Sequence, residues 1–374
     1  MNEKHRSIFL TVVMAVLLFG LSFWAWLKPA DRFSESERRV LQSFPECSAE
    51  TLRTGKFMEE FESYSLDQFP CRDGFRTLKA LTVFHAFQQK DNNDLFIEDG
   101  YVSKLNYPLR DEMLDHAADR FQYLYDNYLA GTDTKLYFSV VPDKSYFLAS
   151  ENGYLSLDYN ALIAKMREKT PYLEYIDIVD ELSLQNYYRT DTHWRQETLL
   201  PVAKKLASAM GVTLSAGYEQ LTLSEPFYGV YTGQSALPLQ PDTLSYLIND
   251  MLEGCTVTSF DTGAAQSVEL YDLSAASSAD PYELFLNGAD ALLVIENPAA
   301  ETDRELIVFR DSFGSSLVPL LVEGYSKVTL VDIRYLNSAY LGNFVEFDDQ
   351  DVLFLYSTLL LNDSLALNRV GGGG

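Results

Sequence analysis

The stretch ELIVFRDSFGSSLVPLL, from Glu305 to Leu321, decides the fold that we expect for this chain. Residues 306–309 are Leu, Ile, Val and Phe, a continuous apolar run that is typical of a strand buried on both faces. Asp311, Ser312 and Gly314 then interrupt the run, and an apolar, helix-like segment follows. The stretch therefore predicts a buried strand that turns directly into a helix.

Five other stretches have the same strand-like character, and segments with helical spacing of apolar residues separate them. The predicted strands are residues 135–141, 175–179, 291–296, 305–309, 327–332 and 352–357. The predicted helices are residues 111–130, 158–169 and 196–210, the first and last of which end at a glycine. Buried strands that alternate with helices predict an α/β fold, a three-layer αβα sandwich around a mostly parallel sheet.

The chain has 374 residues, and its composition divides it into four parts. Residues 1–29 are expected to be a cytoplasmic stub and a transmembrane signal anchor, and residues 30–93 a helical lead-in. Residues 94–366 carry the strand and helix pattern of the α/β domain, within which the less regular residues 212–290 are expected to be an insertion or a cap. Residues 367–374 end in GGGG and predict a disordered tail.

The N-terminal apolar segment SIFLTVVMAVLLFGLSFWAWL, residues 7–27, contains no charge and follows the basic residues Lys4 and Arg6. It is long enough to cross a hydrocarbon core of about 30 Å. A cleavable signal peptide has a shorter apolar run and a small-residue cleavage site, whereas this run ends in bulky Trp26 and Leu27. We therefore expect an uncleaved single-pass anchor in the cell membrane, with the remainder of the chain on the extracellular or periplasmic side.

Charge and cysteine content exclude several classes of function. The chain has 54 Asp and Glu against 29 Lys and Arg, and its net charge of -25 repels a phosphate backbone, so we expect no nucleic-acid partner. Its three cysteines, Cys47, Cys71 and Cys255, form no metal-binding pattern, so we expect neither a metal site nor a cofactor. Pairing of Cys47 with Cys71 outside the cell is left open, because spacing does not determine disulfide geometry.

The histidine in RTDTHWRQE, residues 189–197, differs from the other two outside the anchor. His85 and His116 lie within helix-like segments and are expected to pack there, whereas His193 lies between predicted elements and follows Asp191 by two residues. A carboxylate beside an imidazole fixes its tautomer and stabilises its protonated form, which suits a general base. The alternative is that Asp191 caps the following helix and His193 makes a local hydrogen bond.

Ser312 lies where the predicted strand turns into the predicted helix. A serine at such a turn is exposed at the carboxyl edge of a sheet, near amide groups that can stabilise an oxyanion. We expect Asp311 to brace the turn and Gly314 to allow close backbone approach. The alternative is that Ser312 only caps the helix. Together, Asp191, His193 and Ser312 provide the acid, base and nucleophile that an activated serine needs.

The motifs DTHW (191–194) and DSFG (311–314), with GKFMEEFESYSLDQFPCRD (55–73), resemble the DHHW family and the related AlgX/AlgJ-type alginate O-acetylation proteins, which are SGNH-hydrolase-like. Four shorter stretches are also similar to that family: LFIEDGYVSK (95–104), VVPDKS (140–145), YGVYTG (228–233) and LVDIRYLN (330–337). The resemblance implies that Ser312 is the nucleophile, His193 the base and Asp191 its orienting acid. It also implies a circularly permuted SGNH-like order, because the acid–base pair precedes the serine. We also expect Trp194, the residue after His193, to support the turn.

Five further residues are candidates for the oxyanion donors and the substrate groove. The Ser312 amide and either Gly229 or Gly233 are candidates for oxyanion donors. Lys144, Arg334 and Tyr335 are candidates for the substrate groove, with ordinary exposed turn and strand-end residues as the alternative.

The resemblance implies an exported, membrane-anchored O-acetyltransferase that acts on a cell-surface or secreted polysaccharide. It also implies a membrane-bound O-acyltransferase as the partner that donates the acetyl group. A carbohydrate acetylesterase with the same three residues and a non-catalytic polysaccharide-binding or assembly protein are the two alternatives, and the sequence does not separate them.

Overall fold

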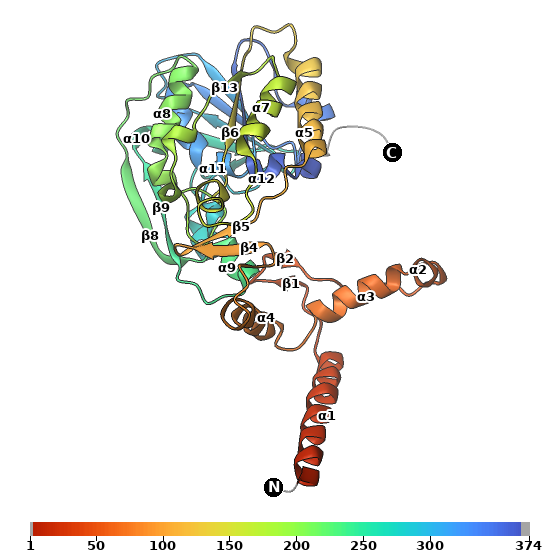
Figure 1. Ribbon diagram of the computed structural model, residues 1–374. Helices are drawn as coiled ribbons and strands as arrows, with labels where there is room; N and C mark the ends of the chain where they lie inside the picture. The colour runs from red at the N-terminus through yellow and green to blue at the C-terminus, as the bar shows by residue number, and fades with distance from the viewer. Residues whose placement is uncertain (1–2, 368–374) are drawn as a thin grey trace. The chain divides into compact units, whose positions relative to one another are not determined.

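The computed structural model describes residues 3–367, and the chain divides into two compact units (Figure 1). The first unit contains the residues up to Asn93 together with Thr232–Leu239, and the second contains Asp94–Tyr231 and the residues from Gln240 onward. The unit boundary passes through the short helix α9 (Val230–Ser235). The tail expected at residues 367–374 lies, apart from Leu367, outside the described residues.

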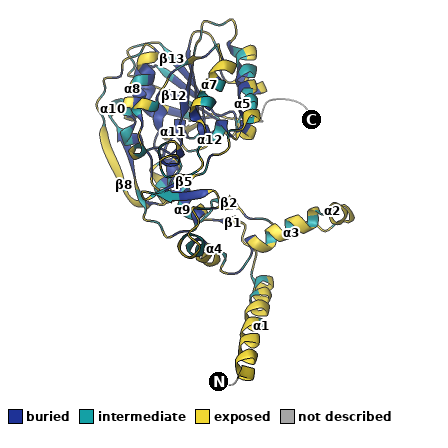
Figure 2. Ribbon diagram, in the orientation of Figure 1, coloured by how far each residue is buried: buried dark blue, intermediate teal, exposed yellow. Residues whose placement is uncertain are grey.

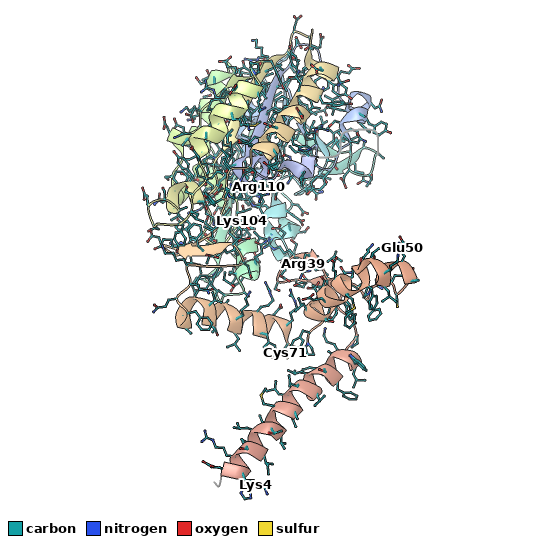
Figure 3. The ribbon with its side chains drawn as sticks, turned by 45° about the vertical axis from the view of Figure 1, so that its right-hand side comes forward. Lys4, Arg39, Glu50, Cys71, Lys104 and Arg110 are labelled. Carbon is teal, nitrogen blue, oxygen red and sulfur yellow. The ribbon has the colours of Figure 1, made fainter. Side chains whose placement is uncertain are left out.

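The first unit begins with helix α1 (Glu3–Leu27), which has no buried residue. At about 1.5 Å per residue its 25 residues span roughly 37 Å, more than the hydrocarbon core of a bilayer. It is the one helix among residues 3–367 that is long and apolar enough to cross a membrane, which is consistent with single-pass anchoring. Figure 2 shows its exposed surface, and Figure 3 shows Lys4 at its N-terminal end.

Short elements make up the remainder of the first unit. They are β1 (Phe33–Ser34), β2 (Arg39–Val40), α2 (Ala49–Thr54), α3 (Lys56–Asp67), α4 (Arg72–Leu81) and β3 (Asp91–Asn92). Ion pairs connect them: Asp67 at the end of α3 pairs with Arg39 at 2.5 Å, and Arg72 at the start of α4 pairs with Glu37 at 2.5 Å. Ion pairs, together with ring contacts of Phe44 on α3, therefore connect these elements.

An eight-stranded sheet forms the centre of the second unit, in the order β11-β10-β12-β14-β13-β15-β6-β7. The strands are β6 (Lys135–Val141), β7 (Glu174–Tyr175), β10 (Thr256–Ser259), β11 (Gln266–Val268), β12 (Leu292–Glu296), β13 (Glu305–Arg310), β14 (Lys327–Val331) and β15 (Asp351–Ser357). Strands β14, β13, β15, β6 and β7 run parallel to one another. Strands β12, β10 and β11 extend the sheet in antiparallel pairs.

Alternate side chains of the central strands enter two different cores, one on each face of the sheet. On β13, Leu306 and Val308 pack with helix α8 (Leu200–Ala209), while Ile307 and Phe309 pack with helices α5 (Asp111–Leu124) and α7 (Tyr159–Lys169). Figure 1 shows α8 on one side of the sheet and α5 and α7 on the other. The expected three-layer αβα architecture is therefore confirmed, as a mixed sheet with an antiparallel edge.

The predicted strands and helices differ from the structure mainly at their ends. The exception is residues 175–179, where only Tyr175 belongs to a strand. The side chain of Asp177 accepts a hydrogen bond from the Val179 N–H at 3.0 Å, and this turn ends the extended conformation.

Residues 212–290 contribute both to the sheet and to structure beside it. Strands β10 and β11 belong to the antiparallel edge, whereas β8 (Glu219–Phe227) and β9 (Asp242–Ile248) form a separate hairpin. The remaining elements of the second unit are β4 (Leu95–Glu98), β5 (Tyr101–Lys104), α6 (Ser145–Leu148), α10 (Asp250–Glu253), α11 (Phe313–Leu317) and α12 (Thr358–Leu361).

Candidate active site

The turn after β13 presents Ser312 at the carboxyl edge of the sheet. Asp311 braces this turn, because its Oδ1 accepts the Phe313 N–H at 3.0 Å and its Oδ2 accepts the Ser357 N–H at 2.8 Å. Ser312 precedes α11, but its side chain makes no capping hydrogen bond to that helix. The alternative in which Ser312 serves only as a helix cap is therefore wrong.

Close packing of Gly314 on Arg310 tightens the same turn. A Cβ at Gly314 would lie 2.8 Å from the Arg310 Cβ, so only glycine fits without a shift. Arg310 is fully buried, and its guanidinium donates to the Ser315 hydroxyl at 3.0 Å. Burial lowers the pKa of Arg310, while the nearby Asp332 carboxylate acts in the opposite direction.

Asp191 and His193 lie in a tight turn between Tyr187 and Trp194, which form an antiparallel bridge. The Tyr188 N–H donates to the His193 carbonyl at 3.1 Å and closes the turn. The imidazole Nδ1 lies 2.6 Å from Asp191 Oδ1, which also accepts the His193 backbone N–H at 3.0 Å. Because the Asp191 oxygens are used here, Asp191 is not a cap for the following helix.

The Asp191 carboxylate is almost completely buried, with 1% of its surface exposed. Burial by itself would raise its pKa, but the adjacent His193 and the hydrogen bonds from the His193 and Val230 N–H groups lower the pKa overall. The Val230 N–H reaches Asp191 Oδ2 at 2.8 Å from the start of α9. Asp191 is therefore an ionised acceptor for the imidazole N–H.

The imidazole connects the two turns. His193 Nε2 lies 2.8 Å from Ser312 Oγ, although 119 residues separate them in the sequence. With Nδ1 donating to Asp191, Nε2 is left as the acceptor for the serine hydroxyl proton. The structure thus brings Asp191, His193 and Ser312 together in one continuous hydrogen-bonded relay at the sheet edge.

The indole of Trp194 also joins the two turns. Its Nε1 lies 3.0 Å from both the Phe313 carbonyl and the Ser316 hydroxyl, and the ring is fully buried. Trp194 therefore holds the turn of Asp191 and His193, the candidate acid–base turn, against the turn of Ser312, the candidate nucleophile turn.

Lys144 lies in the interior and not along a substrate groove. It is 2% exposed, and its ammonium donates to the carbonyls of Tyr188 at 2.9 Å and Arg189 at 3.2 Å. Burial lowers the pKa of Lys144 to about 7, with the nearby carboxylates opposing the shift. The expectation that Lys144 lines the groove is wrong, because its side chain is buried and its ammonium binds backbone carbonyls just before Asp191.

Gly229 serves packing and is not a free oxyanion donor. Its N–H already donates to Thr190 Oγ1 at 3.0 Å, and a Cβ at this position would lie 2.4 Å from the Thr190 carbonyl oxygen. Gly233 belongs to the first unit, where its carbonyl accepts from Arg76 at 2.8 Å. Neither glycine is therefore assigned to oxyanion binding, whereas the Ser312 N–H has no hydrogen-bond partner among residues 3–367.

Arg334 and Tyr335 leave the sheet at the same edge as Ser312. Strands β13 and β14 are parallel neighbours with Phe309 opposite Val331, so the turns that follow them emerge side by side. The Arg334 guanidinium is held by Asp332 at 2.6 Å and stacks on the Tyr335 ring at 5.2 Å. Tyr335 is exposed, and a role for both residues toward substrate stays a prediction.

Sequence reasoning missed three contributors to the site. The Val230 N–H donates to Asp191, the Asp242 carboxylate accepts the Thr190 N–H just before Asp191, and the Tyr282 ring stacks on the His193 ring. They come from the irregular residues 212–290, and no spacing signal relates them to Asp191 or His193.

The structure offers no metal-binding cluster among residues 3–367, where no group of three or more His, Cys, Asp or Glu side chains converges. Cys47 and Cys71 are exposed and free. The arrangement at Ser312 consists of the chain's own hydroxyl, imidazole and carboxylate groups.

No protein-family model and no curated protein sequence matches the chain. Solved structures do match. A DHHW family protein from Eubacterium siraeum is 20% identical, with a TM-score of 0.60 over 76% of this chain and 98% of that chain. Bacillus cereus PatB1, determined with a sulfonyl adduct, is 18% identical, with a TM-score of 0.60 over 72% of this chain and 97% of that chain.

The chain has the fold of a DHHW family protein. A further match, the O-acetyltransferase domain of Pseudomonas putida AlgJ, is 14% identical, with a TM-score of 0.43 over 72% of this chain and 92% of that one. The DHHW family neighbour is thus of the type that the sequence motifs resemble. At 20% identity or less the likeness concerns the fold, and any activity must be argued from the site.

Proposed function

We propose that this chain is an exported, membrane-anchored O-acyltransferase that transfers an acetyl group to a hydroxyl of a cell-surface or secreted polysaccharide. The observation that carries the proposal is the relay from Asp191 through His193 to the Ser312 hydroxyl, with distances of 2.6 and 2.8 Å. A serine within reach of an imidazole that a buried carboxylate orients is an activated nucleophile.

The first half-reaction forms an acetyl-serine. Ser312 Oγ attacks the carbonyl carbon of an acetyl donor as His193 Nε2 takes the hydroxyl proton. The tetrahedral intermediate collapses, and the bond to the donor's leaving group breaks as that group receives the proton from His193. The unpaired Ser312 N–H is positioned on the nucleophile's own residue, where it suits one oxyanion contact.

The second half-reaction releases the acetyl group to the acceptor. A sugar hydroxyl gives its proton to His193 and attacks the acetyl carbonyl, and Ser312 leaves as it regains the proton. Asp191 remains ionised throughout and stabilises the imidazolium that forms in each half-reaction. Water in place of the sugar hydroxyl would give an esterase with the same residues.

The acetyl donor must be supplied on the side of the membrane where the second unit lies. We propose that a multi-span membrane-bound O-acyltransferase delivers it, and that α1 keeps the chain in the same membrane. Support for the anchor comes from the length and the exposed apolar surface of α1.

Incubation of the purified full chain with an activated acetyl ester and an oligosaccharide acceptor tests this proposal. We expect acetyl-oligosaccharide to form faster than free acetate, and we expect Ser312→Ala to abolish both products while retaining its thermal unfolding transition. Free acetate as the main product in the presence of acceptor would identify an esterase. Unchanged polysaccharide acetylation in cells that carry Ser312→Ala would indicate a non-catalytic role.

A further inference from the structure

The His193 imidazole is stacked on the phenol ring of Tyr282. The ring centroids lie 3.8 Å apart and the planes differ by 5°, so the two rings are parallel and in contact. Phe313 packs near the imidazole as well, with a centroid distance of 5.1 Å and an angle of 58°. Tyr282 comes from the 3-10 turn of residues 281–284, outside both turns that make up the relay.

Hydrogen bonding fixes the Tyr282 ring at its far end. Tyr282 is 4% exposed, and its hydroxyl donates to Ser316 Oγ at 2.7 Å. The same Ser316 oxygen accepts the Trp194 indole N–H at 3.0 Å. The phenol ring is therefore held by the helix that follows the nucleophile and is not free to turn.

The orientation of the imidazole plane matters because both of its hydrogen bonds lie in that plane. Nδ1 faces Asp191 and Nε2 faces Ser312, at 2.6 and 2.8 Å. The torsion that rotates a histidine ring has broad minima, so the side chain by itself does not select one plane. Rotation of the imidazole would swing Nε2 away from Ser312 Oγ and would also drive the ring edge into the Tyr282 ring.

We propose that Tyr282 is a positioning residue that holds the His193 imidazole in the plane joining Asp191 to Ser312. It acts through the flat face of its ring, whereas its hydroxyl only anchors that ring. The catalytic consequence rests on the function proposed above, but the ring contact can be tested without any activity.

Two substitutions separate the ring from the hydroxyl. Tyr282→Phe keeps the stacked face and removes the bond to Ser316, and Tyr282→Leu removes the face but retains an apolar side chain of moderate size. We expect kcat for acetyl transfer to fall about ten- to hundredfold in Tyr282→Leu, with KM within about twofold, because misplaced catalytic groups reduce the rate by such factors. Tyr282→Phe is expected to stay within about threefold of the wild-type kcat.

Nuclear magnetic resonance of the full chain in detergent, with labelled histidines, gives the readout that is independent of catalysis. The chain contains four histidines, and a His193→Gln variant assigns the signal of interest. A stacked phenol shifts the imidazole protons upfield by its ring current. The upfield shift should persist in Tyr282→Phe and disappear in Tyr282→Leu.

A matched control is Tyr246→Leu, which removes another buried tyrosine from the same apolar core without touching His193. We expect it to reduce stability while leaving the His193 signals in place and kcat within about threefold of wild type. Should Tyr282→Leu not fold, Tyr282→Met is judged by the same criteria.

The proposal is overturned if folded Tyr282→Leu keeps the kcat of the wild type, because the loss of the ring-current shift follows from removing the ring and does not by itself show that His193 has moved. It is equally overturned if Tyr282→Phe loses as much activity as Tyr282→Leu, since the hydroxyl would then be the important group. If the wild type transfers no acetyl group, the function proposed above fails, and the ring-current shift in the wild type and Tyr282→Phe still decides whether the phenyl face of residue 282 stacks on His193.

Discussion

The two turns that meet at the relay are held in place by different means. The nucleophile turn is braced by its own residues and by the neighbouring strand β15, since Asp311 accepts the Phe313 and Ser357 N–H groups and Gly314 packs on Arg310. The acid–base turn depends on groups that are distant in the sequence: the Lys144 ammonium, the Asp242 carboxylate and the Val230 N–H. The comparison teaches that Ser312 is positioned mainly by its own turn and the adjacent strand, whereas Asp191 and His193 depend on groups from several distant segments.

The largest predicted effect comes from filling the space between Gly229 and the acid–base turn. A Cβ at Gly229 would lie 2.4 Å from the Thr190 carbonyl oxygen and 2.4 Å from the Asp191 backbone nitrogen. The backbone at one of these positions would therefore have to move. We expect Gly229→Ala to lower acetyl transfer by about a hundredfold or more, because the carboxylate and imidazole shift away from Ser312. Steady-state rates, together with circular dichroism spectra to verify folding, check this prediction.

Gly217→Ala is the control for that substitution, because a Cβ at Gly217 meets nothing within 4 Å. We expect its rate and unfolding temperature to match the wild type. Wild-type activity in Gly229→Ala would show that the acid–base turn does not require the close contact.

An intermediate effect is predicted for the Asp242 carboxylate, which holds the irregular segment just before Asp191. The Asp242 carboxylate accepts the Arg189 N–H at 3.0 Å, the Thr190 N–H at 2.8 Å and the Thr190 hydroxyl at 2.7 Å. Asp242→Asn keeps one acceptor oxygen and leaves some of these donors unpaired, which costs about 1–3 kcal/mol per buried group. We expect about a tenfold lower transfer rate and a lower urea midpoint.

The exposed Asp303 provides the comparison for Asp242. Asp303→Asn should change neither the rate nor the urea midpoint. Equal behaviour of the two variants would mean that Asp242 does not support the acid–base turn.

The smallest effect is a pH dependence of stability that arises from Lys144. Burial lowers its folded-state pKa from 10.5 to about 7, so between these values the unfolded chain binds more protons at this position than the folded chain. The contribution of Lys144 to the free energy of unfolding therefore increases as the pH rises across this window. Relative to Lys144→Met, the wild type should gain up to about 1 kcal/mol per pH unit between about pH 7.5 and 9.

Urea denaturation of the wild type and Lys144→Met at several pH values measures this difference. Most other titrating groups contribute equally to both proteins, so their effects cancel in the subtraction. A difference that stays constant or decreases with pH would contradict the buried, proton-releasing environment of Lys144.

Local sequence signals predicted the sheet and the nucleophile turn well. The strand of residues 305–309 and the turn at Ser312 lie next to each other in the chain, and apolar runs and turn residues encode both. Asp191 and His193 were identified for the same reason, since only Thr192 lies between them. Apolar runs do not encode strand direction, so the antiparallel edge formed by β10, β11 and β12 was not foreseen.

The residues that orient the base could not be predicted, because they become neighbours only when the chain folds. Lys144 was expected at a groove, with an ordinary exposed turn lysine as the alternative, but it is buried and donates to two backbone carbonyls. Gly229 was expected to donate its N–H, but that N–H is bonded to Thr190. Tyr282 lies 89 residues beyond His193 in the chain, so periodicity and spacing carry no information about their stacking.

Covalent labelling of the full chain by an arylsulfonyl fluoride, followed by intact-protein and peptide mass spectrometry, tests the central claim most directly. We predict a single sulfonyl adduct on Ser312 that forms rapidly in the wild type and at least about a hundredfold more slowly in folded His193→Ala, since the base no longer accepts the hydroxyl proton. An adduct on another residue, or equal labelling rates in the two proteins, would contradict the claim that His193 activates Ser312.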